Sequence, residues 1–198
     1  MKVPWRVALL LIAIIDPEPA LAHAPIPGLG GFYGGLLHPA LTPAHGLGLF
    51  GLGLLIGGQE ARERYALLVV FAVALLAAIG AIVAAFAFED AGAVVLATAC
   101  VSGILVALAR PVPRLVSIGL AALTAAALML DSVPETISTR ETLVELAGTA
   151  LGASLILAIV SLIGAAARWP WQRIGVRILG SWTAAAAMFG LALQFART

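Results

Sequence analysis

Apolar runs of helical length fill most of the chain, and short stretches rich in arginine, proline or acidic residues separate them. A helix needs about 20 mostly apolar residues to cross a bilayer. We therefore predict six membrane-spanning helices, at residues 43–58, 65–88, 91–109, 112–130, 142–167 and 174–195. The first is short for a span, so we expect a broken, glycine-rich first segment completed by a half-helix at residues 28–38. The predicted fold class is an all-α integral membrane protein.

The N-terminus has the pattern of a secretory signal peptide. Two basic residues precede a short apolar run, and an Ala-Leu-Ala sequence ending at Ala22 is typical of a cleavage site. We predict a cleavable signal peptide at residues 1–22 and one polytopic membrane domain at residues 23–198; the alternative is an uncleaved anchor. Cleavage makes His23 the first residue, where its imidazole and the free amine could chelate a metal, unless the histidine is incidental.

A glycine-rich segment at residues 28–58 holds His38 and His45, the two histidines that we expect inside the membrane. Ionisable residues are costly there and are usually functional. Pro39 and Pro43 fall between them and prevent one regular helix from running through both. Residues seven apart in a continuous helix are roughly 10 Å apart along its axis, so only a break lets both imidazoles reach one ion. No carboxylate lies in the segment, and both histidines could equally be satisfied core or interface residues.

The same segment resembles the HupE/UreJ family of membrane proteins, in which the motif HPxxGxDHxxAMxxVGL follows a Gly-Phe pair. After Gly31-Phe32, the residues that match the motif position by position are His38, Pro39, His45, Gly53 and Leu54. Thr42 replaces the glycine of the motif and Ala44 replaces its aspartate. An Arg-Ile-Leu-Gly-x-Trp-x-Ala-Ala pattern that starts at Arg177 is similar to the last helix of the family.

A second family motif, HGxAHGxE, is expected near the outer end of a later helix. Aligning it on Pro134 places Ala125 and Met129 at its histidines and Ser132 at its glutamate. The second motif is therefore absent. We interpret the chain as a divergent member of the family.

The resemblance implies a permease for a divalent transition-metal cation, nickel or cobalt, that supports hydrogenase or urease. The candidate metal ligands are His38, His45 and His23, and imidazole suits nickel. The metal would be cargo, and no resident cofactor is expected. One alternative is a transporter of another small solute. The other is an accessory or assembly protein that binds a partner protein or a second copy through Gly/Ala-rich helix faces such as Gly30-x-x-x-Gly34.

Composition agrees with a membrane protein, whose main partner is the lipid bilayer. The chain is 62% hydrophobic and 11% charged, with a mean hydropathy of +1.10. A net charge of +1 argues against nucleic acid as a partner, since no basic face could neutralise phosphates. Cys100 is the single cysteine, which excludes an internal disulfide. No enzyme is expected, because the serines in the apolar helices lack a GxSxG elbow and a companion histidine.

The arginines predict the orientation through the positive-inside rule. One set of loops holds Arg62, Arg64, Arg110, Arg114, Arg168, Arg173 and Arg177, whereas the other set holds Arg140 and Arg197. We therefore predict a multi-pass protein of the bacterial inner membrane with both mature termini outside. Acidic residues, Asp131 among them, fall in the outer connections. They are either solvated loop ends or groups that concentrate cations at an outer vestibule.

Overall fold

The computed structural model describes residues 30–86, 88, 90–134 and 138–196, and its regular elements there are all helices. They are α2 (Gly31–Leu41), α3 (Pro43–Gly57), α4 (Ala61–Val83), α5 (Ala91–Leu108), α6 (Arg114–Asp131), α7 (Thr139–Ala165) and α8 (Pro170–Phe195). Five of these, α4 to α8, are long and apolar enough to cross a membrane, and α2 with α3 forms a bent pair that counts as a sixth span. The predicted fold is confirmed. The signal peptide and His23 lie outside the described residues.

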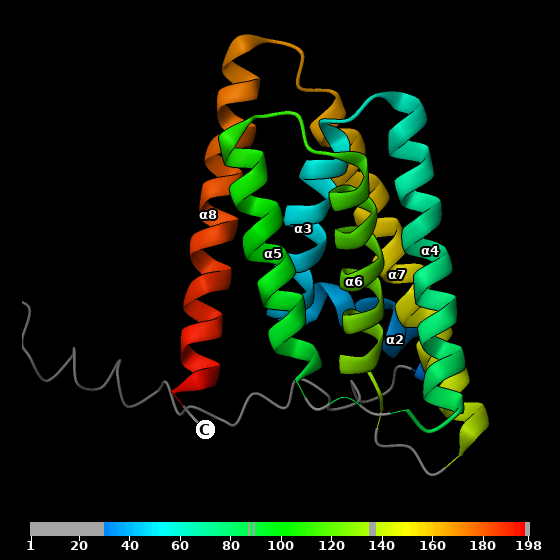
Figure 1. Ribbon diagram of the computed structural model, residues 1–198. Coiled ribbons are helices and arrows are strands. Elements are labelled where there is room, and N and C mark those ends of the chain that lie inside the picture. Colours follow the sequence, from blue (N-terminus) through cyan, green and yellow to red (C-terminus); the bar gives the residue numbers. More distant parts are fainter. Residues whose placement is uncertain (1–29, 87, 89, 135–137, 197–198) are drawn as a thin grey trace, which may run out of the picture.

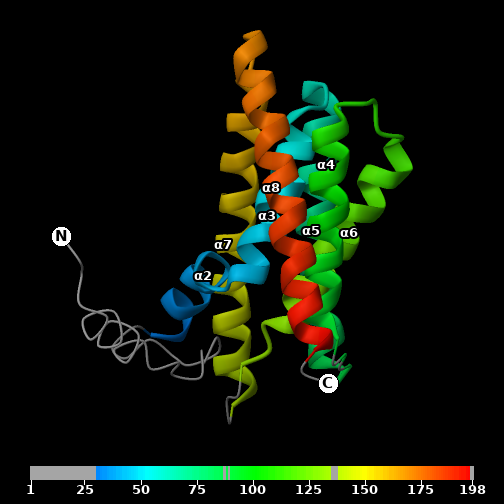
Figure 2. The same cartoon turned by 90° about the vertical axis from the view of Figure 1, so that its left-hand side faces the viewer.

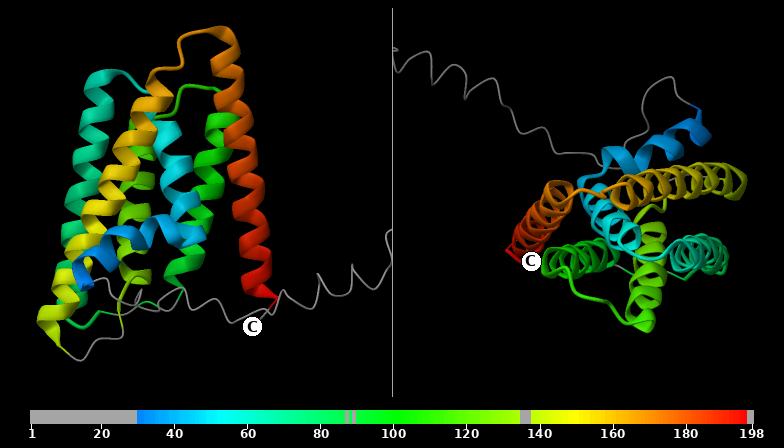
Figure 3. Two further views of the ribbon diagram at one scale, coloured as in Figure 1. Left: turned by 180° about the vertical axis from the view of Figure 1, so that it is seen from behind. Right: turned by 90° about the horizontal axis from the view of Figure 1, so that it is seen from above.

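The short helix α3 lies in the centre of the bundle and contacts every other described helix (Figure 3). It begins inside the bundle rather than at its end, whereas the surrounding helices run the full length (Figure 1). Leu49, Leu52 and Ile56 of α3 are completely buried. This central helix is therefore packed on all sides by protein, and the other helices separate it from lipid.

The break between α2 and α3 falls at Thr42, and the two axes differ in direction by 68°. Pro43 opens α3 and disfavours a helical conformation for the residue before it, so Thr42 takes an extended backbone (φ −89°, ψ 112°). The predicted break is confirmed. Pro39, however, lies inside α2, which runs three residues beyond the expected end at His38; in the last turn its missing N–H removes only one late hydrogen bond.

Glycines bring α2 into backbone contact with α7, against which it lies across the bundle axis (Figure 2). A methyl group at Gly35, Gly148 or Gly152 would collide with a backbone carbonyl of the facing helix, at Glu145, Phe32 and Leu36 respectively. These three glycines therefore allow α2 and α7 to pack closely. Gly30 and Gly34, named above as a possible face for a partner, have open space where a side chain would stand and make no such contact with a described helix.

A second close contact joins α3 and α7 at their C-terminal ends. A Cβ atom at Gly57 would lie 2.6 Å from the Ser161 carbonyl oxygen and 2.9 Å from the Cα of Gly164. Only glycine fits at so short a distance. The bundle is therefore pinched where α3 and α7 end.

The outer surface of the bundle is apolar. Large apolar side chains on α4 and α8, among them Val73, Leu76, Trp182 and Phe189, are more than half exposed. A helix that is apolar on its exposed face has lipid rather than water as its solvent. This surface is that of a multi-pass membrane protein.

The antiparallel helices gather the two predicted sets of loops at opposite ends of the bundle (Figure 1). The arginine end, at the top of Figure 1, is where α3, α5 and α7 finish and α4, α6 and α8 begin. It carries Arg62, Arg64, Arg110, Arg114, Arg168, Arg173 and Arg177. The histidine end is the opposite one, where α6 finishes and α5 and α7 begin. The helix break lies toward the histidine end.

Candidate metal site at the helix break

The break places His38 in the last turn of α2 and His45 in the first turn of α3. The centroids of the two imidazole rings are 5.1 Å apart, and the ring planes meet at 68°. A continuous helix would separate these residues by roughly 10 Å along its axis. The change of direction at Thr42 therefore brings the two imidazole rings together.

His45 bonds to a carboxylate that the motif segment does not contain. Its Nε2 lies 2.8 Å from Oδ2 of Asp131, the last residue of α6. The side chain of His45 is fully buried and that of Asp131 is 24% exposed. Asp131 is therefore not a solvated loop end, and the absence of a carboxylate near the histidines holds only along the sequence.

This bond fixes which nitrogen of His45 carries the proton. An ionised carboxylate only accepts hydrogen bonds, so Nε2 donates its proton to Asp131. In a neutral imidazole the other nitrogen, Nδ1, then has a lone pair and no proton. Nδ1 is buried and has no hydrogen-bond partner among the described residues. A metal-ligating histidine commonly has this arrangement, with its second nitrogen bonded to a carboxylate.

The start of α5 lies against the carboxylate. A Cβ atom at Gly92 would lie 2.9 Å from Oδ1 of Asp131, so a larger residue there would require the carboxylate to shift. Gly92 is itself buried in the second residue of α5. Three helices that are distant in sequence, α3, α5 and α6, therefore meet at the His45–Asp131 pair.

Thr42 adds a hydroxyl group beside the pair of histidines. It is buried, and its Oγ1 lies 3.5 Å from Nε2 of His38, the long limit for a hydrogen bond. Thr42 is a further oxygen donor within reach of the two imidazoles.

The site does not amount to a closed metal cage. Within residues 30–86, 88, 90–134 and 138–196, no three His, Cys, Asp or Glu side chains converge as a metal-binding group. The arrangement is two imidazoles with a carboxylate that orients one of them. His23 lies outside the described residues and stays a predicted ligand.

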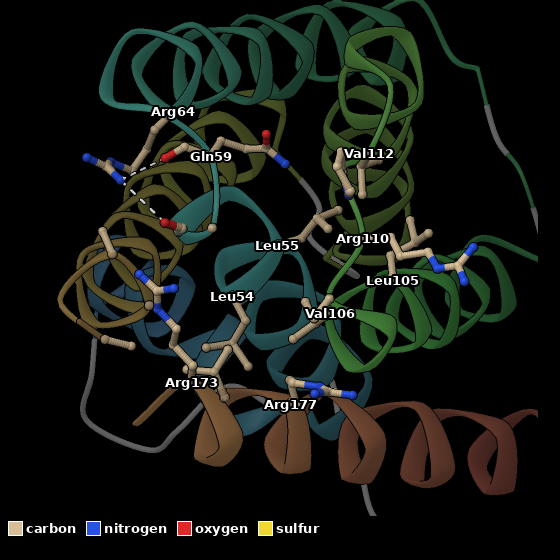
Figure 4. Close-up of a pocket in the computed structure, with 18 of the residues that line it drawn as sticks. Leu54, Leu55, Gln59, Arg64, Leu105, Val106, Arg110, Val112, Arg173 and Arg177 are labelled. Atoms are coloured by element: carbon tan, nitrogen blue, oxygen red, sulfur yellow. Dashed lines mark hydrogen bonds between the residues drawn. The ribbon is translucent and has the colours of Figure 1, made fainter. Parts of the chain in front are cut away.

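The arginine end contains a different kind of site. A cavity of about 670 Å³ opens there, and its lining includes Arg64, Arg110, Arg173, Arg177 and one acidic residue, Glu60. Figure 4 shows the four arginines around its edge, with apolar side chains such as those of Leu54, Leu55 and Val106 between them. Guanidinium groups have donors only and cannot coordinate a cation. The described lining therefore does not offer a set of side chains that would hold a metal ion in the cavity.

Two of these arginines bind the carboxyl ends of helices. Arg64 Nη1 donates to the carbonyl oxygens of Gly57 and Gln59, at 3.4 and 3.3 Å, and Arg177 Nε donates to that of Ala107 at 3.0 Å. The last carbonyls of a helix have no partner within the helix and carry partial negative charge. The arginines thus stabilise the ends of α3 and α5.

Asp131 is the site residue that sequence reasoning missed. The alignment on Pro134 placed the glutamate of the second motif at Ser132, whose hydroxyl group instead donates to the Leu128 carbonyl. The residue immediately before it is Asp131. A carboxylate one position from the expected acid was the signal that could have identified it.

Apolar helices around a broken central segment, with an ionisable pair at the break, define a polytopic membrane protein with a candidate functional site at the break. The chain belongs to the HupE / UreJ protein family, which it matches over residues 9–193. The family is generally linked to nickel or cobalt uptake or to urease and hydrogenase maturation. No curated protein and no solved structure gave a significant match to the chain.

Proposed function

We propose that this protein is a permease for a divalent transition-metal cation of the nickel or cobalt class. The observation that carries the proposal is the state of His45. Its buried Nδ1 has no hydrogen-bond partner among the described residues, its Nε2 lies 2.8 Å from Oδ2 of Asp131, and the His38 ring is adjacent. Family membership supports the same class of cargo.

In this proposal His45 Nδ1 and one nitrogen of His38 are the two side-chain ligands. Asp131 is a positioning residue, because it holds the proton of His45 on Nε2 and so leaves Nδ1 free to bind. Two imidazoles leave most coordination positions of a divalent ion open for water, a backbone carbonyl or the hydroxyl group of Thr42. Such incomplete coordination suits transport, since the ion must also leave.

Uptake of radiolabelled nickel and cobalt by cells tests the proposal. His38→Ala and His45→Ala should each reduce uptake to the level of an empty vector without lowering the amount of protein in the membrane. The control is Asp90→Asn, which neutralises an exposed acidic residue at the same end of the bundle. If both histidine variants accumulate metal as the unchanged protein does, the permease proposal fails. The accessory role becomes the better one, and crosslinking should then identify a partner.

We propose further that the arginine end faces the cytoplasm of a bacterial inner membrane, with the histidine end outside. The seven arginines at one end support this orientation through the positive-inside rule. Reporter fusions after Glu63 and Val112 should be active as cytoplasmic fusions, and those after Asp90 and Ser138 as external ones. A cytoplasmic report from Ser138 would overturn the orientation.

A further inference from the structure

Three buried hydroxyl groups differ from the others in the bundle. The oxygens of Ser102, Ser117 and Thr124 are buried and have no hydrogen-bond partner among the described residues. Five other buried hydroxyl groups donate to a carbonyl of their own helix: those of Thr98, Ser132, Thr149, Ser161 and Thr183. The same local bond is the ordinary solution for serine and threonine in a helix. A buried polar group without it requires an explanation.

Two of the three lie in a stripe on α6 that begins at the candidate metal site. Asp131, Thr124 and Ser117 are spaced by seven residues, so they share one face of the helix at intervals of roughly 10 Å. Asp131 ends α6 beside His45, and Ser117 lies in its first turn at the arginine end. The stripe therefore crosses most of the bundle.

The central helix α3 presents glycines to the hydroxyl residues. A Cβ atom at Gly48, one turn after His45, would lie 3.6 Å from Cγ2 of Thr124. A Cβ atom at Gly51, the next turn, would lie 3.5 Å from Cβ of Ser102 on α5. Thr124 and Ser102 therefore approach α3 where it has no side chain, through the methyl carbon of Thr124 and the Cβ of Ser102, in the two turns that follow His45.

The next turns lead to the cavity at the arginine end. Leu54 and Leu55 follow Gly51 on α3, Val106 follows Ser102 by one turn on α5, and all three line that cavity. The unpartnered oxygens thus occupy the part of the bundle between the metal site and the cavity. Nothing else in the described residues joins these two regions with polar side chains that lack a partner.

We propose that Thr124, Ser102 and Ser117 form a polar track along which the transported cation passes between His45 and the cavity. The inference rests on the proposed permease function. Each hydroxyl oxygen has lone pairs that can replace a water molecule of the ion, and none is already committed to a helix carbonyl. All three oxygens are inaccessible in this conformation. The structure is therefore the occluded state of the track.

Uptake by a triple variant, Thr124→Val with Ser102→Ala and Ser117→Ala, tests the track. Thr→Val replaces the hydroxyl group with a methyl group of similar shape, and Ser→Ala removes the hydroxyl group. We expect the initial rate of nickel uptake to fall about tenfold or more, while the dissociation constant for nickel of the purified protein changes less than twofold. The matched control is Thr149→Val with Ser161→Ala, which removes two buried hydroxyl groups of α7 that donate to their own helix. It should keep its rate within twofold.

The outcomes separate the track from the function on which it rests. A triple variant that transports at the unchanged rate, while His45→Ala abolishes uptake, overturns the track and leaves the permease proposal intact. Uptake that survives His45→Ala overturns the permease proposal itself. The melting temperature of the triple variant shows whether it is folded. If uptake is slower and the melting temperature is equal to or above that of the unchanged protein, the variant is folded and the track is supported. If the melting temperature is lower, the loss of uptake is attributed to misfolding and the track is overturned.

Cysteine accessibility gives a second test, because the chain has a single native cysteine, Cys100. In a Cys100→Ser background, Thr124→Cys and Ser117→Cys should each make uptake sensitive to block by Cd²⁺. Thr149→Cys should not. Equal insensitivity of all three variants would contradict the track.

Discussion

The histidine end and the arginine end of the bundle place their charged groups in opposite surroundings. At the histidine end, His45 is fully buried and its one ionic partner, Asp131, is largely covered. At the arginine end, Arg110, Arg173 and Arg177 are exposed around an open cavity. A buried ionisable pair is costly and usually functional, whereas exposed arginines cost little, and Arg177 also stabilises the end of α5. We therefore expect the histidine end to decide which ion binds and the arginine end to decide how the protein is oriented in the membrane.

The largest effect on stability should come from separating α2 from α7, because α2 carries His38 at the histidine end. Gly35→Ala drives a methyl group into the backbone carbonyl of Glu145, and backbone cannot move aside as a side chain can. We expect a loss of roughly 3 kcal/mol or more of stability, measured as reduced membrane abundance and a lower unfolding temperature. Gly34→Ala is the matched control, since a methyl group there meets no atom within 4 Å. Equal stability of both variants would contradict the contact.

A smaller effect should follow from Asp131→Asn, which sharpens the comparison by removing the charge of the buried pair. An asparagine amide can also donate to Nε2, which allows the proton of His45 to move to Nδ1 and block the ligand. We expect nickel affinity to fall about 10- to 100-fold, as when other carboxylates that orient metal ligands are changed. Equilibrium binding to purified protein measures it. Asp90→Asn should leave the affinity unchanged, and a similar loss in both variants would attribute the effect to general electrostatics.

The smallest effect is expected at the arginine end. Arg177→Gln removes the donor to the Ala107 carbonyl at the end of α5, in an exposed position. A charge at a helix end contributes about 0.3 to 1 kcal/mol, so the unfolding temperature should fall slightly and nickel affinity should not change. Arg62→Gln, an exposed arginine outside the cavity, is the control. A large loss of nickel affinity in Arg177→Gln would remove the distinction between the two ends.

The features that could be predicted from the sequence are those that depend on neighbouring residues along the chain. Pro43 forces the break, the apolar runs mark the spans, and together they bring His38 close to His45. Of the boundaries that differ, the largest shift is at α4, which ends at Val83 rather than at residue 88, because the chain turns at Ala85 with a positive φ of 62°.

Contacts between distant segments were not predicted. Asp131 meets His45 across 86 residues, a pairing that depends on how α3, α5 and α6 pack. For the same reason, the sequence does not show which glycines lie at a contact between helices. A helix that is apolar all round gives no sign of which face meets its neighbour, so Gly35 could not be told from Gly34. The signal peptide and the role of His23 stay predictions.

The close contact between the ends of α3 and α7 can act as a pivot about which the two helices rock. Gly57 and Gly164 form the fulcrum at the arginine end, while at the other end His45 travels with α3 and His38 travels with α2 on α7. From Gly57 to His45 the arm is about 18 Å long at 1.5 Å per residue. A splay of about 5° at the fulcrum would move the tip by roughly 1.5 Å on an arm of that length, enough to make or break a coordinate bond. In the permease that we propose, a slight rocking of the two helices would therefore bind or release the ion.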